Sequence, residues 1–168
     1  MIGGDYCRIM ARYNAWQNSQ LVDLLDVLDG DELTRDRGAF FGSILGTLNH
    51  ILWGDGMWMS RFDGGAAPSV GGADGPGMHA DLAGWKNERA EMDARISRWA
   101  SELKDQDLDQ DLSWYSGVLG RETRNQMGVC VAGLFNHQTH HRGQVHAMLT
   151  AAGSNAPVSD LAFMPKEN

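Results

Sequence analysis

The sequence predicts an all-α protein that folds as a four-helix bundle. Three observations lead to this class. The chain has four long stretches in which apolar residues recur every three or four positions, as on the buried face of an amphipathic helix. Segments rich in glycine and aspartate separate these stretches. The length of 168 residues suits one domain, so we expect a single domain over residues 1–168.

The first two helices are expected over residues 5–28 and 42–62. The inward-facing residues of the first are Met10, Tyr13, Gln17, Leu21, Leu24 and Leu28. Those of the second are Phe41, Leu45, Leu48, Leu52, Met59 and Phe62. Gly30 follows the first helix as a stop signal, and Gly42 or Ser43 stands near the start of the second, where an N-cap is needed.

The segment after the second helix, residues 64–77, is too rich in glycine and proline for a helix or a regular strand, and we expect it to be the most flexible part of the chain. About 15 extended residues span roughly 50 Å. A helix of about 20 residues is only about 30 Å long. The linker can therefore run back along the bundle, so that the second and third helices lie parallel.

The third and fourth helices are expected over residues 81–103 and 128–152, with Asp81 as the N-cap of the third and Gly153 after the fourth. The third has a charged face that we expect to be solvated: Lys86, Glu88, Arg89, Glu91, Arg95 and Arg98. Residues 105–127 between them give a weak signal for a short strand or hairpin. The tail, residues 157–164, is expected to pack as an extended cap.

Composition and charge exclude several function classes. The net charge of −8, without a basic run, argues against nucleic-acid binding. No apolar run reaches the ~18 residues of a membrane span, and the start lacks the features of a signal peptide, so we expect a cytoplasmic protein away from membranes. Cys7 and Cys130 are expected to be reduced, buried thiols. The alternative is a thiol close enough to a metal site to react.

The most informative motif is the pair His137 and His141. Two histidines four apart on a helix lie one turn apart on the same face and can bind one metal ion. Both fall on the apolar face of the fourth helix, where each needs a polar partner. A shared metal satisfies both at once, and hydrogen-bonded core histidines are the alternative.

His50 is the third candidate ligand. Gly46 and Gly54 stand four residues before and after it, and because glycine weakens a helix, the pair indicates that space is needed there. Trp53 and Met57 follow on the same face and suggest a pocket wall. The alternative is a half-buried histidine at an ordinary close contact between helices.

Three other metal architectures do not fit. A zincin needs HExxH, but Gln138, Thr139 and His140 separate the two histidines. No Glu-x-x-His pair of a di-iron bundle and no paired Cys/His spacing of a zinc finger is present. Three histidines without a fourth protein ligand leave one coordination position open, as in catalytic zinc sites.

Three segments now carry a resemblance to a known family: residues 13–18 (YNAWQN), 33–50 (LTRDRGAFFGSILGTLNH) and 135–144 (FNHQTHHRGQ). Over nearly its whole length the chain resembles the DinB/YfiT-like family of small metal-binding four-helix proteins. The resemblance implies an up-down-down-up bundle with a long crossover linker, and a homodimer. It also implies a divalent ion, zinc or nickel, held by His50, His137 and His141. Relatives in the wider superfamily include enzymes that use a low-molecular-weight thiol.

These features lead to the hypothesis of a metal-dependent transferase or hydrolase that acts on a small molecule, with or without a low-molecular-weight thiol. Water or a thiol at the open position would become a nucleophile at neutral pH. The residues expected to orient the ligands are Asn49, Asn136, His140 and Gln144. Those expected to form apolar walls are Trp53, Met57 and Trp58.

Two other points stay open from the residues alone. Arg142 is expected either to bind an anionic substrate group or to form a surface salt bridge, and no general base is evident. The alternative function is a non-enzymatic stress-response or ligand-binding protein in which the metal braces the bundle. Structural zinc sites normally have four protein ligands, so a fourth ligand such as Asp55 or His140 would favour this reading.

Overall fold

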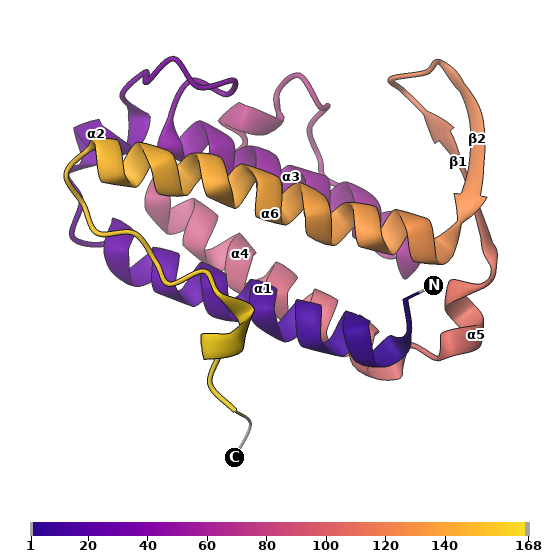
Figure 1. The fold of residues 1–168 in the computed structure, drawn as a ribbon. Helices are drawn as coiled ribbons and strands as arrows, with labels where there is room; N and C mark the ends of the chain where they lie inside the picture. Colours follow the sequence, from indigo (N-terminus) through magenta and orange to yellow (C-terminus); the bar gives the residue numbers. More distant parts are fainter. Residues whose placement is uncertain (1, 167–168) are drawn as a thin grey trace.

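Four long helices lie side by side in the computed structural model, which describes residues 2–166 (Figure 1). They are α1 (Gly4–Leu25), α3 (Ile44–Phe62), α4 (Leu82–Glu102) and α6 (Met127–Ala151). The shorter elements are α2 (Gly30–Thr34), α5 (Asp105–Leu108) and the 3-10 turns η1 (Gly75–Gly77) and η2 (Leu161–Phe163). The mostly helical fold is as predicted, and each long helix ends within three residues of its expected bounds.

Helix ends follow from local hydrogen bonds that the sequence indicated. The Ser43 side chain accepts from the backbone N–H of Gly46 at 3.0 Å and so caps α3. Asp81 caps α4 in the same way, accepting from the N–H of Gly84 at 2.9 Å. Gly153, with φ of 77°, lies in the left-handed region just after α6, where glycine is the favoured residue.

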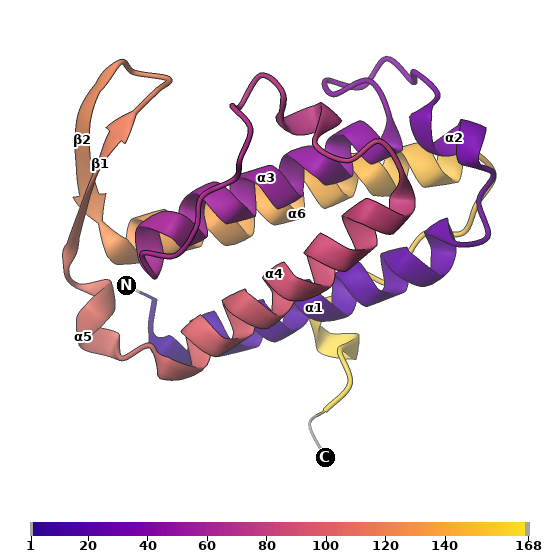
Figure 2. The same cartoon turned by 180° about the vertical axis from the view of Figure 1, so that it is seen from behind.

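Contacts between α3 and α4 show that these two helices run in the same direction. Near the start of α4, Trp85 Nε1 donates to the carbonyl of Leu48 in the first half of α3, at 3.2 Å. Near its end, Arg95 forms an ion pair with Asp63, which directly follows α3, at 2.7 Å. Figures 1 and 2 show α1 and α6 running the opposite way. The long linker therefore returns along the molecule, as its length suggested.

The linker between α3 and α4 is held along α3 by specific contacts, although the sequence suggested that it would be the most flexible stretch. Trp53 Nε1 donates to the carbonyl of Val70 at 3.0 Å. Asn49 Nδ2 donates to the carbonyls of Pro76 and His79 at 3.0 and 2.9 Å. The glycines let the linker lie close against these side chains, so composition alone was a poor guide to its order.

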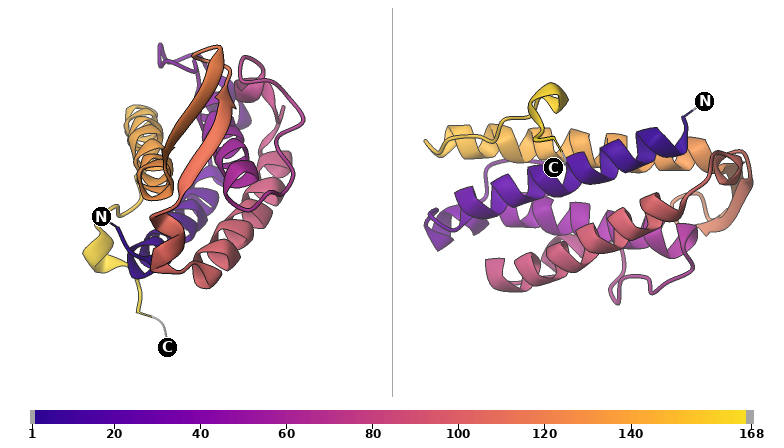
Figure 3. Two further views of the ribbon diagram at one scale, coloured as in Figure 1. Left: turned by 90° about the vertical axis from the view of Figure 1, so that its right-hand side faces the viewer. Right: turned by 90° about the horizontal axis from the view of Figure 1, so that it is seen from below.

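A β-hairpin precedes α6, in the segment where a short strand or hairpin was weakly indicated, so the fold is mostly helical and not purely all-α. Its strands are β1 (Asp111–Ser116) and β2 (Arg121–Gln126), paired antiparallel with Asp111 opposite Gln126. The hairpin stands at the end of the bundle where α6 begins (Figure 3). β1 alternates between exposed and half-buried positions, whereas β2 consists only of polar residues. The second strand therefore lacks the apolar alternation by which a strand is recognised.

The tail after α6 lies along α1, as expected for a cap. The Tyr13 hydroxyl donates to the carbonyl of Ser159 at 2.5 Å, and Gln17 Nε2 donates to the carbonyl of Val158 at 2.7 Å. None of the helices between residues 2 and 166 has the length and apolar character needed to cross a membrane.

A chain of buried polar side chains crosses the core and joins all four long helices. Asp55 of α3 is fully buried and accepts from Arg89 Nη1 of α4 at 2.6 Å and from Gln138 Nε2 of α6 at 2.9 Å. Arg89 also pairs with Asp93, which accepts from Asn14 of α1 at 3.0 Å. Arg89 is 2% exposed, so its assignment to the solvated face of the third helix was wrong.

Candidate metal centre

The structure brings His50 of α3 together with His137 and His141 of α6. Their potential ligand nitrogens all lie within 4.8 Å of one another. The Nε2 atoms of His50 and His137 are 3.0 Å apart. In a tetrahedral zinc site with Zn–N bonds of about 2.0–2.1 Å, ligand nitrogens are about 3.3 Å apart. The separation between His50 and His137 is close to this value, and all three side chains are near enough to converge on a single ion.

Two glycines of α3 provide the space for this cluster. A Cβ atom at Gly54 would lie 2.8 Å from Cε1 of His137, closer than carbon atoms can approach. A Cβ atom at Gly46 would lie 2.4 Å from the carbonyl oxygen of Phe41. Phe41 in turn stacks on the His50 ring, with centroids 3.8 Å apart and planes 23° apart. Gly54 thus makes room for one partner histidine, and Gly46 makes room for the backbone of Phe41, the residue whose ring stacks on His50.

Gln144 orients His141. The His141 Nδ1 atom lies 2.7 Å from Gln144 Oε1, and because that oxygen can only accept, Nδ1 is the protonated nitrogen. The Nε2 lone pair of His141 is then free for a ligand bond. Gln144 also places its amide nitrogen 3.5 Å from Nε2 of the exposed His140.

Burial keeps the three imidazoles neutral. It lowers the pKa of His50 to about 4, and the neighbouring His137 and His141 contribute to this lowering. The pKa of His137 is also lowered to about 4, first by burial and then by His141 and His140. Burial lowers the pKa of His141 as well. Neutral imidazoles retain the lone pairs that bind metal ions, so the cluster is prepared for ligation at pH 7.

Of the other residues expected at the site, some line the pocket and others do not. Trp53 and Met57 line a pocket next to His137, where apolar walls were expected. Asn49 is buried, but its amide donates to the linker carbonyls described above, so it does not serve to orient a histidine. Asn136 is exposed on α6, and its side chain makes no hydrogen bond within the described part of the chain.

The pocket next to the histidines has a volume of about 580 Å³. His137 of α6 is one of its lining residues, and the others come from α3, the linker and the hairpin. The lining residues are Trp53, Gly54, Met57, Trp58, Arg61, Val70, Gly71, Gly72, Trp114, Ser116, Gly117, Val118 and His137. Sequence reasoning missed the contribution of the hairpin, because its position relative to α3 depends on the whole fold.

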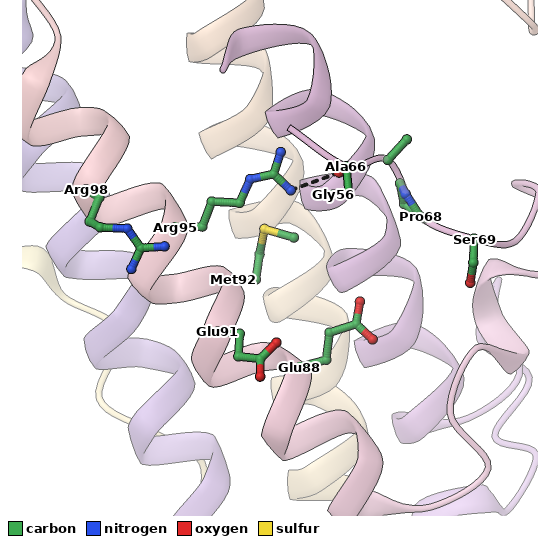
Figure 4. Close-up of a pocket in the computed structure, with 10 residues that line it drawn as sticks. Gly56, Ala66, Pro68, Ser69, Glu88, Glu91, Met92, Arg95 and Arg98 are labelled. Atoms are coloured by element: carbon green, nitrogen blue, oxygen red, sulfur yellow. Dashed lines mark hydrogen bonds between the residues drawn. The ribbon is translucent and has the colours of Figure 1, made fainter. Parts of the chain in front are cut away.

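A second hollow, of about 440 Å³, lies between α4 and the start of the linker and includes none of the three histidines (Figure 4). Its charged residues are already engaged in part. Arg95 donates to the carbonyl of Ala66 at 2.9 Å and pairs with Asp63, while Glu88 lies 2.7 Å from His79 Nε2. We therefore place the candidate site at the pocket beside His137.

Two residues weighed for roles at the site have other roles. Asp55, considered as a fourth ligand, is committed to Arg89 and Gln138 in the buried polar chain. Arg142 is buried and donates to the side-chain oxygen of Asn14, so it neither forms a surface salt bridge nor faces the pocket. The buried role of Asp55 could have been suspected from the sequence, because it is a charged residue within an otherwise apolar helix face.

Both cysteines are free and buried, as expected. Burial raises the pKa of Cys7 to about 11 and also raises that of Cys130. Neither lines the pocket beside His137. The alternative of a reactive thiol at the metal centre therefore has no support.

Comparison with known proteins places the chain in a family. The model of the DinB family matches residues 5–167. A crystal structure of a DinB-like protein from Bacillus cereus has a TM-score of 0.62 and 19% sequence identity to this chain, and the match covers 87% of this chain and 90% of that one. This likeness shows a shared fold, and no curated protein matches the chain. Taken with the family match, these findings show that the chain belongs to the DinB family.

Proposed function

We propose that the protein is a divalent-metal-dependent enzyme that acts on a small molecule at the three-histidine centre. The observation that supports the proposal is that the histidine cluster lies beside a pocket. Three neutral imidazoles converge, and one of them, His137, borders a pocket large enough for a small organic molecule. DinB family membership is compatible with metal binding at this position.

His50, His137 and His141 would hold the ion, and zinc or nickel is the expected metal. A bound divalent ion would lower the pKa of a water or thiol at its open position, which yields a nucleophile at neutral pH. Gln144 fixes the tautomer of His141, and Phe41 covers one face of His50 against water. We infer a transferase that uses a low-molecular-weight thiol, or a hydrolase.

The residues that line the pocket include no aspartate, glutamate or lysine. A side-chain carboxylate is therefore not placed to act as general base there, and a metal ion held by the three histidines would supply the activation of the nucleophile. This separates the proposed chemistry from that of zincins, in which a glutamate takes the proton.

The alternative, a non-enzymatic protein whose metal braces the bundle, needs a fourth protein ligand. Within residues 2–166 the group that could hold a metal ion consists of three histidines and includes neither candidate for a fourth ligand. Asp55 is paired with Arg89, and His140 is exposed. The open-site enzyme is therefore the better supported function. A homodimer and a cytoplasmic location stay predictions.

The first test is metal analysis by inductively coupled plasma mass spectrometry on protein purified without an affinity tag. We expect about one transition-metal ion per chain, lost in His50→Ala and His141→Ala. His146→Ala, on the same helix but outside the cluster, is the matched control and should keep its metal. The metal-loaded protein would then be assayed with thiols and electrophiles. Lack of metal in the wild type after incubation with zinc or nickel would overturn the proposal.

A further inference from the structure

One stripe of α3 connects the histidine cluster to the far end of the pocket. His50, Gly54, Met57 and Arg61 follow one another at spacings of four, three and four residues, so they share a helix face. Gly54 touches His137, and Arg61 lines the pocket seven residues further on. At 1.5 Å per residue, the two positions are about 10 Å apart along the helix. A ligand of one or two rings can span that distance.

Arg61 is the charged end of this stripe. Its guanidinium lies over the ring of Trp58 at 4.7 Å and over that of Trp114, from the hairpin, at 5.5 Å. No ion pair of Arg61 occurs within residues 2–166. Besides these two rings, its described neighbour is Cys130, whose pKa is raised by burial, so that it remains a neutral thiol. Stacking holds the guanidinium plane but leaves its N–H donors without a carboxylate.

The other arginines near α3 behave differently. Arg89 pairs with Asp55 and Asp93, and Arg95 pairs with Asp63, so each has its carboxylate within 2.7 Å. Arg61 instead faces a cavity that is lined mainly by tryptophan, methionine, valine and glycine. An oriented guanidinium among apolar walls is suited to bind the anionic group of a largely apolar molecule.

We propose that the pocket binds an apolar, ring-containing substrate that carries a carboxylate or a similar anion, with Arg61 binding the anion. The apolar body lies against Trp53, Met57 and Trp114, and the opposite end of the molecule reaches the edge formed by His137. That the bound molecule is a substrate rests on the proposed function. Its binding to the pocket does not require the metal. Arg61 is a specificity-determining residue in this scheme.

The test compares two fluorescent probes that differ by one anionic group. 8-Anilinonaphthalene-1-sulfonate carries a sulfonate, and N-phenyl-1-naphthylamine is the same ring system without it. Both are titrated into metal-free wild type, Arg61→Gln and Arg98→Gln. Arg98 lies on α4 in the second hollow and is the matched control for loss of one arginine. Circular dichroism verifies that each variant is folded.

We expect Arg61→Gln to weaken binding of the sulfonate probe about tenfold or more, the usual effect of a lost charge-assisted hydrogen bond. Binding of the neutral probe should change less than about twofold, and Arg98→Gln should leave both unchanged. Trp114→Leu should weaken both probes, since it removes a wall that they share. Equal loss of both probes in Arg61→Gln, or no binding of either probe to wild type, would overturn the proposal.

The two proposals fail separately. Metal content is measured on the same preparations, and Arg61 is not in the histidine cluster. If the protein binds metal but shows no Arg61-dependent preference for the sulfonate probe, the proposed anion site is contradicted and the proposed metal site is supported. If it shows this preference but binds no metal, the anion site is supported and the proposed enzyme function is contradicted.

Discussion

Gly54 is the residue on which the geometry of the histidine cluster depends most directly. The His137 ring occupies the space that a side chain at this position would fill. The same contact therefore packs α3 against α6 and brings His137 close to His50. A glycine inside a helix costs about 1 kcal/mol relative to alanine. At this position the glycine provides the space that the His137 ring occupies.

We therefore expect Gly54→Ala to weaken metal binding about ten- to hundredfold, the range found when groups that orient ligands are disturbed. The new Cβ atom would meet His137 at 2.8 Å and push the ring away. Competition with a chromophoric zinc chelator measures the effect. Gly133→Ala, also in a helix but at a position where a Cβ atom would meet no neighbour within 4 Å, should bind zinc as the wild type does. Equal affinities of all three proteins would contradict this role.

The depressed histidine pKa values make the stability of the metal-free protein depend on pH. In the folded state His50 and His137 take up protons only near pH 4, whereas in the unfolded chain they do so below about pH 6.5. Between these values the unfolded state binds more protons, so stability falls as the pH decreases from about 6.5 to about 4. Melting temperatures of metal-free wild type and His137→Gln across this range should converge at acid pH. A constant difference would show that the histidine is not titrating as described.

At the scale of elements, the segments that connect the helices form much of the pocket. The linker is attached to α3 through Trp53 and Asn49, and the hairpin contributes Trp114. The helices were predictable because their periodic patterns are long. The hairpin was indicated only weakly, since β2 carries no apolar alternation and its partner strand is short. The order of the linker depends on buried side chains of another element, which composition does not reveal.

Asn49 is the residue expected to hold the linker in place. Asn49→Ala would leave the carbonyls of Pro76 and His79 without their donor, and we expect a loss of about 1–3 kcal/mol in the free energy of unfolding. Amide hydrogen exchange across residues 70–79 should become faster than in wild type. Asn87→Ala, at an exposed site of α4, is the control and should change neither quantity. Unaltered exchange in Asn49→Ala would show that other contacts hold the linker.

At the scale of the whole molecule, the buried polar chain ties the four long helices into one arrangement. The sequence did not reveal it, because Arg89 lies among charged residues that are partly or fully exposed, and its burial depends on partners from other helices. The three histidines were easier to find, since two share one helix face and the third is flanked by glycines. The role of Asn49 could not be predicted from the sequence, because it depends on the linker carbonyls that the fold places beside it.

Asp55→Ala should therefore be strongly destabilising. It leaves the Arg89 guanidinium buried with one carboxylate instead of two, and breaking a buried ion pair costs about 3–5 kcal/mol. Asp5→Ala removes a comparable pair, with Arg8, at the surface, where the cost is about 0–1 kcal/mol. Urea unfolding of both variants measures the difference. Similar values would mean that water or another group compensates for the lost carboxylate.

The division of the site between helices and connections has a consequence for how the pocket can vary. The candidate metal ligands lie on α3 and α6, whereas the linker and the hairpin supply walls that a ligand would touch. Insertions and substitutions are tolerated more readily in connections than in packed helices. Changes in these two connections are therefore expected to alter the walls of the pocket while the three-histidine cluster on the helices stays in place.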